Sequence, residues 1–224
     1  MEIAVEQTFC LRCLRILGVR TSKAMVETPV FRAYAATIFT PALKRRLYGY
    51  KFYRRHEHLP VMTELLIHYW KEVLLHATEA CHPEHTLVIP IPAHWGAESR
   101  VEAFAKGFAR HFEYDYQPQI LQWCREVQPQ HSIADKRARF QNIAQSLRVS
   151  QSSCLHGYRH LLLIDDLTTT GATLREAVRA LYAELTDSGV LVFGNLYQPS
   201  EQRSDIPKLM TLALASIPLG LQGN

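Results

Sequence analysis

The segment that most constrains the fold is LLLIDDLTTTGATL, residues 161 to 174. Its first four residues have the apolar composition of a buried strand, and a helical pattern of apolar residues begins at Leu174. Two aspartates and a run of threonines around Gly171 stand between the two patterns. Because a buried strand that turns directly into a helix is the repeating unit of open parallel sheets, the segment predicts an α/β architecture.

Other apolar segments alternate in the same way along the chain. Helical spacing predicts helices over residues 34–53, 60–76, 98–112 and 174–185. Short apolar runs predict strands over residues 86–92, 119–123, 161–164 and 190–197. The polar segment 125–149 is predicted to be a long loop that leads into a short helix. This order favours an open parallel sheet with flanking helices, in which ligands bind at the carboxyl ends of the strands.

The residues after Ile164 have the chemistry of a site for ribose 5-phosphate. A strand-to-helix turn presents backbone N–H groups at the start of a helix, which suits an anion. Glycine lets the backbone approach a phosphate, threonine hydroxyls add donors, and carboxylates accept hydrogen bonds from paired ribose hydroxyls. The residues predicted to contact ribose 5-phosphate are Asp165, Asp166, Thr168, Thr169, Thr170, Gly171, Ala172 and Thr173.

The same turn allows two other interpretations. In the first, Thr170 or Thr173 caps the helix and the aspartates merely favour the loop. The second, a Walker-type nucleotide loop, fits less well because it needs a lysine after the glycine, where this chain has Ala172 and Thr173.

Composition sets the remaining bounds. A chain of 224 residues can hold one sizeable domain with a small appendage, and its formal charge of +4 does not by itself indicate nucleic acid. The amino terminus lacks the pattern of a secretory signal, and no stretch approaches ~18 uncharged apolar residues, so we expect no membrane span. The chain has five cysteines, an odd number, and most of them are far apart in the sequence. This favours a reducing compartment over a set of disulfides, and we expect a cytoplasmic protein.

A family resemblance follows from these motifs. IDDLTTTGAT, residues 164 to 173, resembles the phosphoribosyl-diphosphate signature of type I phosphoribosyltransferases. More narrowly, the chain resembles the ComF, or GntX-like, family of competence proteins through YGYKF at 48–52, VIPIP at 88–92 and QHSIADKRARFQN at 130–142. The resemblance implies a small N-terminal segment over 1–33, a phosphoribosyltransferase-like domain of the type I fold over 34–200, and an apolar tail over 201–224.

The resemblance also implies a function. We expect the protein to bind phosphoribosyl diphosphate with Mg²⁺ and to transfer its ribose 5-phosphate to an acceptor that the sequence does not identify. The alternative is a ligand sensor or a DNA-uptake accessory protein that uses the same fold without turnover.

Particular residues take roles by the same resemblance. Arg100 and Lys106 are expected to contact the diphosphate, although the family's Arg-Gly-Phe-Asn run is Lys-Gly-Phe-Ala here. The polar segment takes the place of the fold's mobile loop, and Arg125, Lys136, Arg137 and Arg139 in it could neutralise departing diphosphate. The residues expected to act in catalysis are Asp165, Asp166, Arg137 and Arg139, with the two aspartates also next to Mg²⁺. The alternative for each basic residue is a solvated surface charge.

Three other features leave open which partners the protein has. Cys10 and Cys13 form half of a zinc site, but the next cysteine is Cys81, so the four-cysteine module of the resembled family is incomplete. The basic, aromatic segment 44–55 could bind single-stranded DNA, or could be a helix with a solvated basic side. DNA-uptake proteins are the other macromolecular partners that the resemblance suggests. Residues 209–221 could cover a sheet edge or form the contact of a homodimer.

Overall fold

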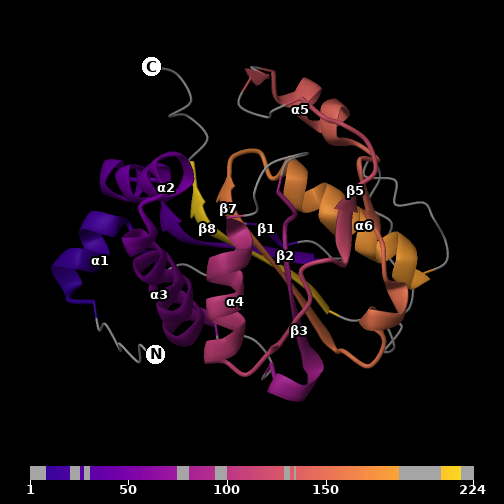
Figure 1. The fold of residues 1–224 in the computed structure, drawn as a ribbon, viewed down its shortest axis with the longest axis horizontal. Coiled ribbons are helices and arrows are strands. Elements are labelled where there is room, and N and C mark those ends of the chain that lie inside the picture. Colours follow the sequence, from indigo (N-terminus) through magenta and orange to yellow (C-terminus); the bar gives the residue numbers. More distant parts are fainter. Residues whose placement is uncertain are drawn as a thin grey trace.

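The fold is organised around a six-stranded sheet in the order β1-β2-β8-β7-β3-β4 (Figure 1). A computed structural model of the chain describes residues 9–20, 26–27, 31–74, 81–93, 100–128, 132–133, 135–186 and 208–217. Strands β2, β8, β7, β3 and β4 run parallel, and β1 pairs antiparallel with β2. The sheet strands are β1 (Val26–Glu27), β2 (Phe31–Ile38), β3 (Thr86–Pro90), β4 (Asp115–Tyr116), β7 (His160–Thr168) and β8 (Lys208–Ser216).

Within the described ranges, six α-helices surround this sheet. They are α1 (Leu11–Leu17), α2 (Pro41–Tyr53), α3 (Leu59–Tyr69), α4 (Val101–His111), α5 (Lys136–Ile143) and α6 (Ala172–Thr186). A π-helical turn (Trp70–Leu74) extends α3, and 3-10 turns cover His56–His58, Pro83–His85 and Ser152–Leu155. A separate antiparallel pair is formed by β5 (Leu121–Trp123) and β6 (Leu147–Val149). The predicted α/β class with an open parallel sheet is confirmed.

Two apolar layers cover the two faces of the sheet, and β7 shows how the sequence produces them. Successive strand residues point to opposite faces. Leu162 and Ile164 pack with residues of α2, α3 and α4, whereas Leu161 and Leu163 pack with residues of α6 and of the β5–β6 pair. All four side chains are fully buried. Figure 1 shows α2, α3 and α4 on one side of the sheet, α6 on the other, and α5 beyond the end of β7.

The predicted helix over residues 34–53 is wrong in its first part. Residues 31–38 form β2, and the helix begins at Pro41 with the Thr40 side chain accepting a hydrogen bond from the N–H of Leu43. The segment Phe31–Ile38 is buried on both faces for most of its length, and its alanines fit a strand between two layers as well as a helix. Strand β2 therefore takes residues that the apolar spacing assigned to a helix.

The carboxyl-terminal segment also differs from the prediction. Lys208–Ser216, part of the expected apolar tail, is strand β8 in the interior of the sheet, where it pairs with β2 and β7. A strand buried on both faces is a continuous apolar run without alternation, and this explains why residues 209–216 did not show strand periodicity. The predicted strand at 119–123 is present as β5, but it pairs with β6 outside the main sheet. The predicted strand at 190–197 lies outside the described residues.

The length and apolar character of the helices indicate whether any of them could cross a membrane. None of those in the described ranges has the length and apolar character that crossing a bilayer requires.

The position of β8 generates a first prediction. Leu212 is fully buried between Tyr34 of β2 and Ile164 of β7, so we expect Leu212→Ala to lower the free energy of unfolding by about 2–5 kcal/mol. Urea unfolding followed by circular dichroism measures this change. The control is Leu11→Ala, at a side chain that is 78% exposed on α1, with an expected change within about 0.5 kcal/mol. Equally small losses in both variants would contradict the central position of β8.

Candidate functional site

Two neighbouring aspartates lie on β7 near the carboxyl end of the sheet. The sequence predicted that the strand ends at Ile164, but pairing with β8 continues through Asp165 opposite Ala213 and Thr168 opposite Ser216. Asp165 and Asp166 are each 9% exposed. The strand therefore places two carboxyl groups in a largely buried position, with the small side chain of Ala213 opposite Asp165 on the adjacent strand.

The two carboxyl groups differ in their surroundings. The N–H of Asp166 donates a hydrogen bond of 2.8 Å to Oδ1 of Asp165. Burial, together with the charge of Asp166, raises the pKa of Asp165 to about 7, although this hydrogen bond and the charge of Lys51 act in the opposite direction. Asp165 therefore changes its protonation state near neutral pH, and its affinity for a cation or a hydroxyl group depends on pH there.

Lys51 of α2 forms an ion pair with Oδ2 of Asp166. Lys51 belongs to the YGYKF motif, but its sequence context did not predict a place for it in the site. The signal that could have found it is helical spacing, since Leu43, Leu47 and Lys51 follow each other at intervals of four residues and share one face of the helix. The first two are fully buried, so the stripe that packs on the sheet ends in a lysine.

The turn from β7 to α6 has the backbone geometry expected of the phosphate site. Gly171 has a φ of 74°, in the left-handed region that favours glycine, and its carbonyl accepts a hydrogen bond of 2.9 Å from the N–H of Arg175. A Cβ atom at Gly171 would come no closer than 4.0 Å to Oγ1 of Thr168. Packing against described neighbours therefore does not require glycine here, which leaves backbone conformation and room for a ligand as the reasons for it.

The threonines of the turn are buried or half-buried and take part in its structure. Oγ1 of Thr170 accepts a hydrogen bond of 3.3 Å from the N–H of Ala172, the first residue of α6. This contact is of the kind expected if Thr170 caps the helix. The carbonyl of Thr168 accepts a bond of 3.1 Å from the N–H of Ile217, which ties the turn to the end of β8.

Helix α5 brings Arg139 to this turn. Its Nη1 donates to Oγ1 of Thr169 at 3.5 Å, and its Nε donates to the carbonyl of Ile133 at 2.6 Å. Arg137 lies on the same helix and is exposed. Of the two arginines predicted to act together, the structure places Arg139 against the turn and leaves Arg137 toward solvent.

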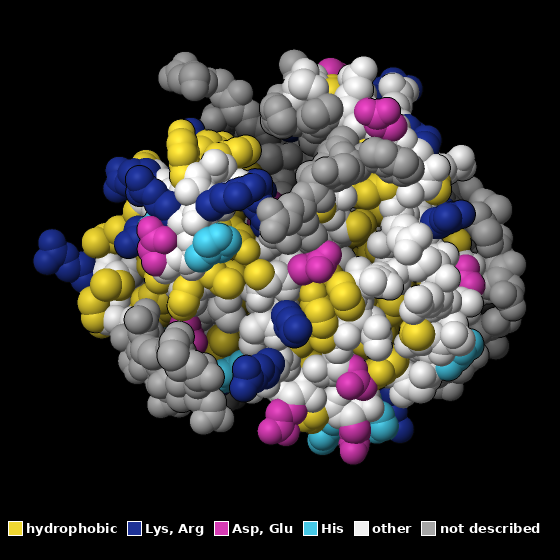
Figure 2. All heavy atoms as spheres, viewed as in Figure 1, with side chains coloured by type: hydrophobic (Ala, Val, Ile, Leu, Met, Phe, Trp, Pro, Cys, Tyr) yellow, Lys and Arg dark blue, Asp and Glu magenta, His cyan; other side chains and the backbone are white. Residues whose placement is uncertain are grey.

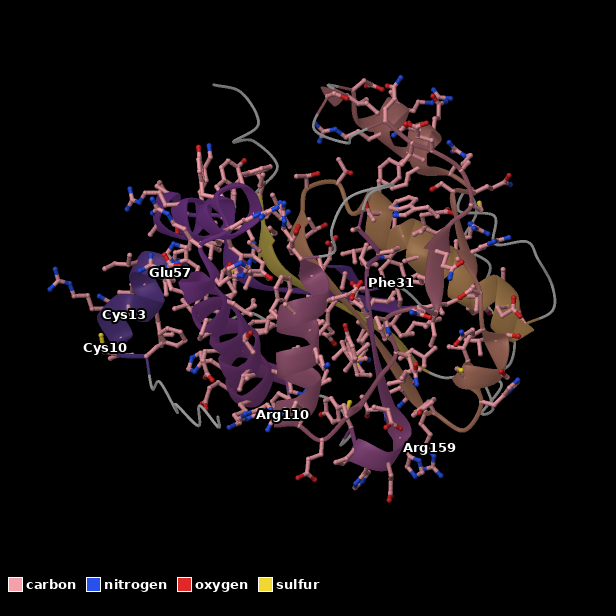
Figure 3. The ribbon with its side chains drawn as sticks, in the orientation of Figure 1. Cys10, Cys13, Phe31, Glu57, Arg110 and Arg159 are labelled. Atoms are coloured by element: carbon pink, nitrogen blue, oxygen red, sulfur yellow. The ribbon has the colours of Figure 1, made fainter. Side chains whose placement is uncertain are left out.

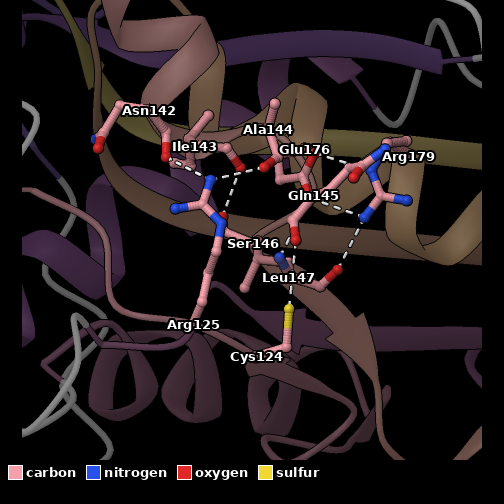
Figure 4. A network of polar contacts seen from close by, with 10 residues as sticks. All are labelled: Cys124, Arg125, Asn142, Ile143, Ala144, Gln145, Ser146, Leu147, Glu176 and Arg179. Carbon is pink, nitrogen blue, oxygen red and sulfur yellow. Dashed lines mark hydrogen bonds and ion pairs between the residues drawn. The ribbon is translucent and has the colours of Figure 1, made fainter.

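A network of polar contacts fixes α5 and its flanking strands to α6 (Figure 4). Nη2 of Arg125 donates hydrogen bonds to the carbonyls of Asn142 at 2.8 Å and Ala144 at 2.7 Å, at the carboxyl end of α5. Arg125 was predicted to neutralise diphosphate, but its donors satisfy helix carbonyls that have no partner within the helix. The structure therefore gives Arg125 a role in holding the segment.

The second half of this network is centred on Glu176 of α6. Its buried carboxylate accepts a bond of 3.2 Å from the N–H of Leu147 and pairs with Arg179, whose Nη2 also donates to the carbonyl of Leu147 at 2.8 Å. Both backbone polar groups of a β6 residue are thus bound by side chains of α6. The charged pair fixes the distance between the short sheet and the helix that follows the phosphate turn.

The two residues predicted to bind diphosphate lie at different places. Arg100 precedes α4, and its guanidinium carbon lies 5.9 Å from the centre of the Phe52 ring, while its carbonyl accepts a bond of 3.4 Å from the Tyr50 hydroxyl. Tyr50 and Phe52 flank Lys51, so Arg100 packs against the part of α2 that reaches the acidic pair. Lys106 is exposed on α4. Residues 94–99 of the expected diphosphate loop lie outside the described part of the chain.

The cysteine pair and the basic surface lie elsewhere. Cys10 and Cys13 are exposed on the outer side of α1 with their Sγ atoms 3.3 Å apart (Figure 3). Among the described residues, no group of three or more potential ligands could complete a metal site. The basic segment 44–55 falls largely on α2, where a shallow hollow of about 320 Å³ is lined by Lys44, Arg45, Tyr48, Gly49, Tyr53 and Arg55. Figure 2 shows basic and apolar side chains together on this side of the molecule.

Comparison with known proteins adds no assignment to this geometry. No protein-family model matches the chain, and no curated protein matches it.

The raised pKa of Asp165 generates a second prediction. Between about pH 4 and pH 7 the folded protein holds this proton more tightly than the unfolded chain, so rising pH destabilises the folded state through that window. Asp165→Asn cannot titrate. We expect the difference in free energy of unfolding between this variant and the wild type to shift in favour of the variant as pH rises, and to become constant above about pH 7. One pKa unit corresponds to about 1.4 kcal/mol. Urea unfolding at several pH values measures the difference, and a constant difference would show that Asp165 has an ordinary pKa.

Proposed function

We propose that the protein binds phosphoribosyl diphosphate together with Mg²⁺ and transfers its ribose 5-phosphate to an acceptor nucleophile. The observation that carries this proposal is the arrangement at the end of β7, where two buried carboxyl groups directly precede a threonine-rich turn with Gly171 at a positive φ. A candidate diol site and a candidate anion site thus follow each other directly along the chain, and a ribose phosphate carries both kinds of group. The type I phosphoribosyltransferase fold and the ComF family fit this arrangement by resemblance.

The 5-phosphate would bind at the start of α6. The first N–H groups of a helix have no acceptor within the helix, and the aligned peptide dipoles favour an anion there. Helix α6 is 15 residues long and follows Gly171 directly. Half-buried Thr169, Thr170 and Thr173 lie on the turn, where their hydroxyls can add donors to those of the backbone.

The acidic pair suits the ribose hydroxyls and a magnesium ion. Carboxylate oxygens are ligands of the kind that Mg²⁺ prefers, and this ion usually keeps several waters or phosphate oxygens in its shell. Two carboxylates cannot complete an octahedral site, so most of the ligands would come from the diphosphate and from water. Asp165 and Asp166 would orient the ribose and hold the ion next to it.

In the proposed reaction, the bond between C1 of the ribose and the diphosphate oxygen breaks, and the diphosphate leaves with the electron pair. The acceptor forms the new bond to C1 and loses a proton, for which a carboxylate of the acidic pair is a candidate acceptor. Arg139 next to the turn, exposed Arg137, and Arg100 beside α2 are positive groups that could stabilise the departing diphosphate.

The proposal is tested by calorimetric titration with phosphoribosyl diphosphate, with and without Mg²⁺, and with ribose 5-phosphate for comparison. We expect binding that depends on magnesium and is tighter than that of ribose 5-phosphate, because the diphosphate adds contacts and metal ligands. Binding without release of diphosphate in the presence of nucleobases, amines or nucleic acids would favour a ligand sensor. No binding of either compound would contradict the proposal.

A glycine substitution tests the phosphate turn itself. We expect Gly171→Asn to fold, since asparagine tolerates positive φ, and to weaken phosphoribosyl diphosphate binding roughly tenfold or more, because its side chain enters the phosphate position. The matched control is Gly157→Asn, at an exposed glycine with a φ of 92° where no heavy atom of the described residues lies within 4 Å of an added Cβ. Equal affinities for both variants would place the phosphate elsewhere.

A further inference from the structure

The Lys51–Asp166 ion pair joins the basic helix α2 to the acidic pair of β7. We propose that Lys51 is an exchange residue, which neutralises Asp166 in the unliganded protein and moves its ammonium group to an anionic phosphate oxygen when ligand occupies the acidic pair. This inference rests on the proposed function and adds to it a binding residue and a reason for coupled binding of the metal and the sugar phosphate.

The two buried carboxyl groups of β7 require a positive charge nearby. Asp165 and Asp166 are consecutive residues, and each is 9% exposed. Two negative charges so close together repel each other, and burial removes much of their hydration. Lys51 supplies the positive charge that the structure places on Asp166. Any cation that binds the same carboxylate must either displace this ammonium group or bind next to it against repulsion.

The Lys51 side chain can change its partner without a movement of its helix. The Lys51 side chain is 24% exposed while that of Asp166 is 12% exposed, so the pair has one partly solvated partner. A lysine carries its charge on a flexible stem of four carbons and can change partner by side-chain rotation alone. The helix itself stays in place, because Leu43 and Leu47 are fully buried and Tyr50 and Phe52 contact Arg100.

Helix α2 also contacts a residue that is expected to bind the diphosphate. Tyr50 and Phe52, the residues before and after Lys51, contact Arg100, the residue expected to serve the diphosphate, so one turn of α2 contacts both Arg100 and, through Lys51, the acidic pair. A diphosphate held by Arg100 would lie near the turn of α2 that carries Lys51. Release from Asp166 therefore does not leave the ammonium group without a partner, since the ligand's own phosphates provide one.

A thermodynamic consequence follows. Free Mg²⁺ competes with Lys51 for Asp166 and brings no new partner for the lysine, so it binds weakly by itself. Magnesium with phosphoribosyl diphosphate replaces the lost ion pair with a lysine–phosphate contact. Lys51 therefore makes the binding of the metal and of the diphosphate positively coupled, and such coupling is reciprocal.

The test is calorimetry on the full chain with three variants. Lys51→Met keeps the length of the side chain and removes its charge, Lys51→Arg keeps the charge, and Lys44→Met is the control on the outer side of the same helix, where Lys44 lies 5.4 Å from the Tyr48 ring centre. Each protein is titrated with Mg²⁺ alone, with ribose 5-phosphate, and with phosphoribosyl diphosphate at saturating Mg²⁺. Unfolding midpoints establish that the variants are folded.

We expect Lys51→Met to bind Mg²⁺ alone roughly tenfold more tightly and phosphoribosyl diphosphate roughly tenfold more weakly, with Lys44→Met unchanged and Lys51→Arg in between. Loss of diphosphate affinity without a gain for Mg²⁺ would make Lys51 a fixed phosphate contact and would overturn the exchange. Unchanged affinities for both would remove Lys51 from the site. If the wild type binds no phosphoribosyl diphosphate, the proposed function fails. The role of Lys51 as counterion of Asp166 is overturned separately, if Lys51→Met and the wild type bind Mg²⁺ with the same affinity.

Discussion

Two adjacent carboxyl groups on an interior strand impose the constraint around which the rest of the structure is arranged. Asp165 and Asp166 lie beside β8, directly after the last β7 residue that pairs with β3, and water reaches less than a tenth of their surface. Such groups need a proton, a cation or hydrogen-bond donors. The protein supplies all three, since Asp165 has a raised pKa, Asp166 pairs with Lys51, and the N–H of Asp166 donates to its neighbour. The placement of α2 over this end of the sheet is therefore an electrostatic requirement as well as a packing one.

The sequence predicted the elements whose signals are local. Leu161–Ile164, the acidic pair, the glycine turn and the start of α6 form one continuous segment, so chain geometry alone brings them together. Prediction failed where burial on both faces removed the periodic signal, as in β2 and β8. It also missed Lys51, because an ion pair between α2 and β7 depends on how distant elements pack.

The arginines show a second limit of sequence reasoning. Arg125, Arg137 and Arg139 belong to one basic segment and have the same chemistry, yet the structure separates them. Arg125 binds carbonyls at the end of α5, Arg139 contacts Thr169, and Arg137 faces solvent. Composition identifies a group of cations near an expected anion, whereas only the packed structure shows which of them already have backbone acceptors.

The interior position of β8 bears on how the chain folds during synthesis. Strand β2 lies between β1 and β8, and its parallel partner is translated only when residues 208–216 leave the ribosome. Until then β2 and β7 each have an edge without its final neighbour, and pairing between segments so distant in sequence is slow. The nascent chain therefore carries the unpaired edge of β2 for most of its synthesis, and that of β7 during the last part, and such edges are the kind that chaperones shield.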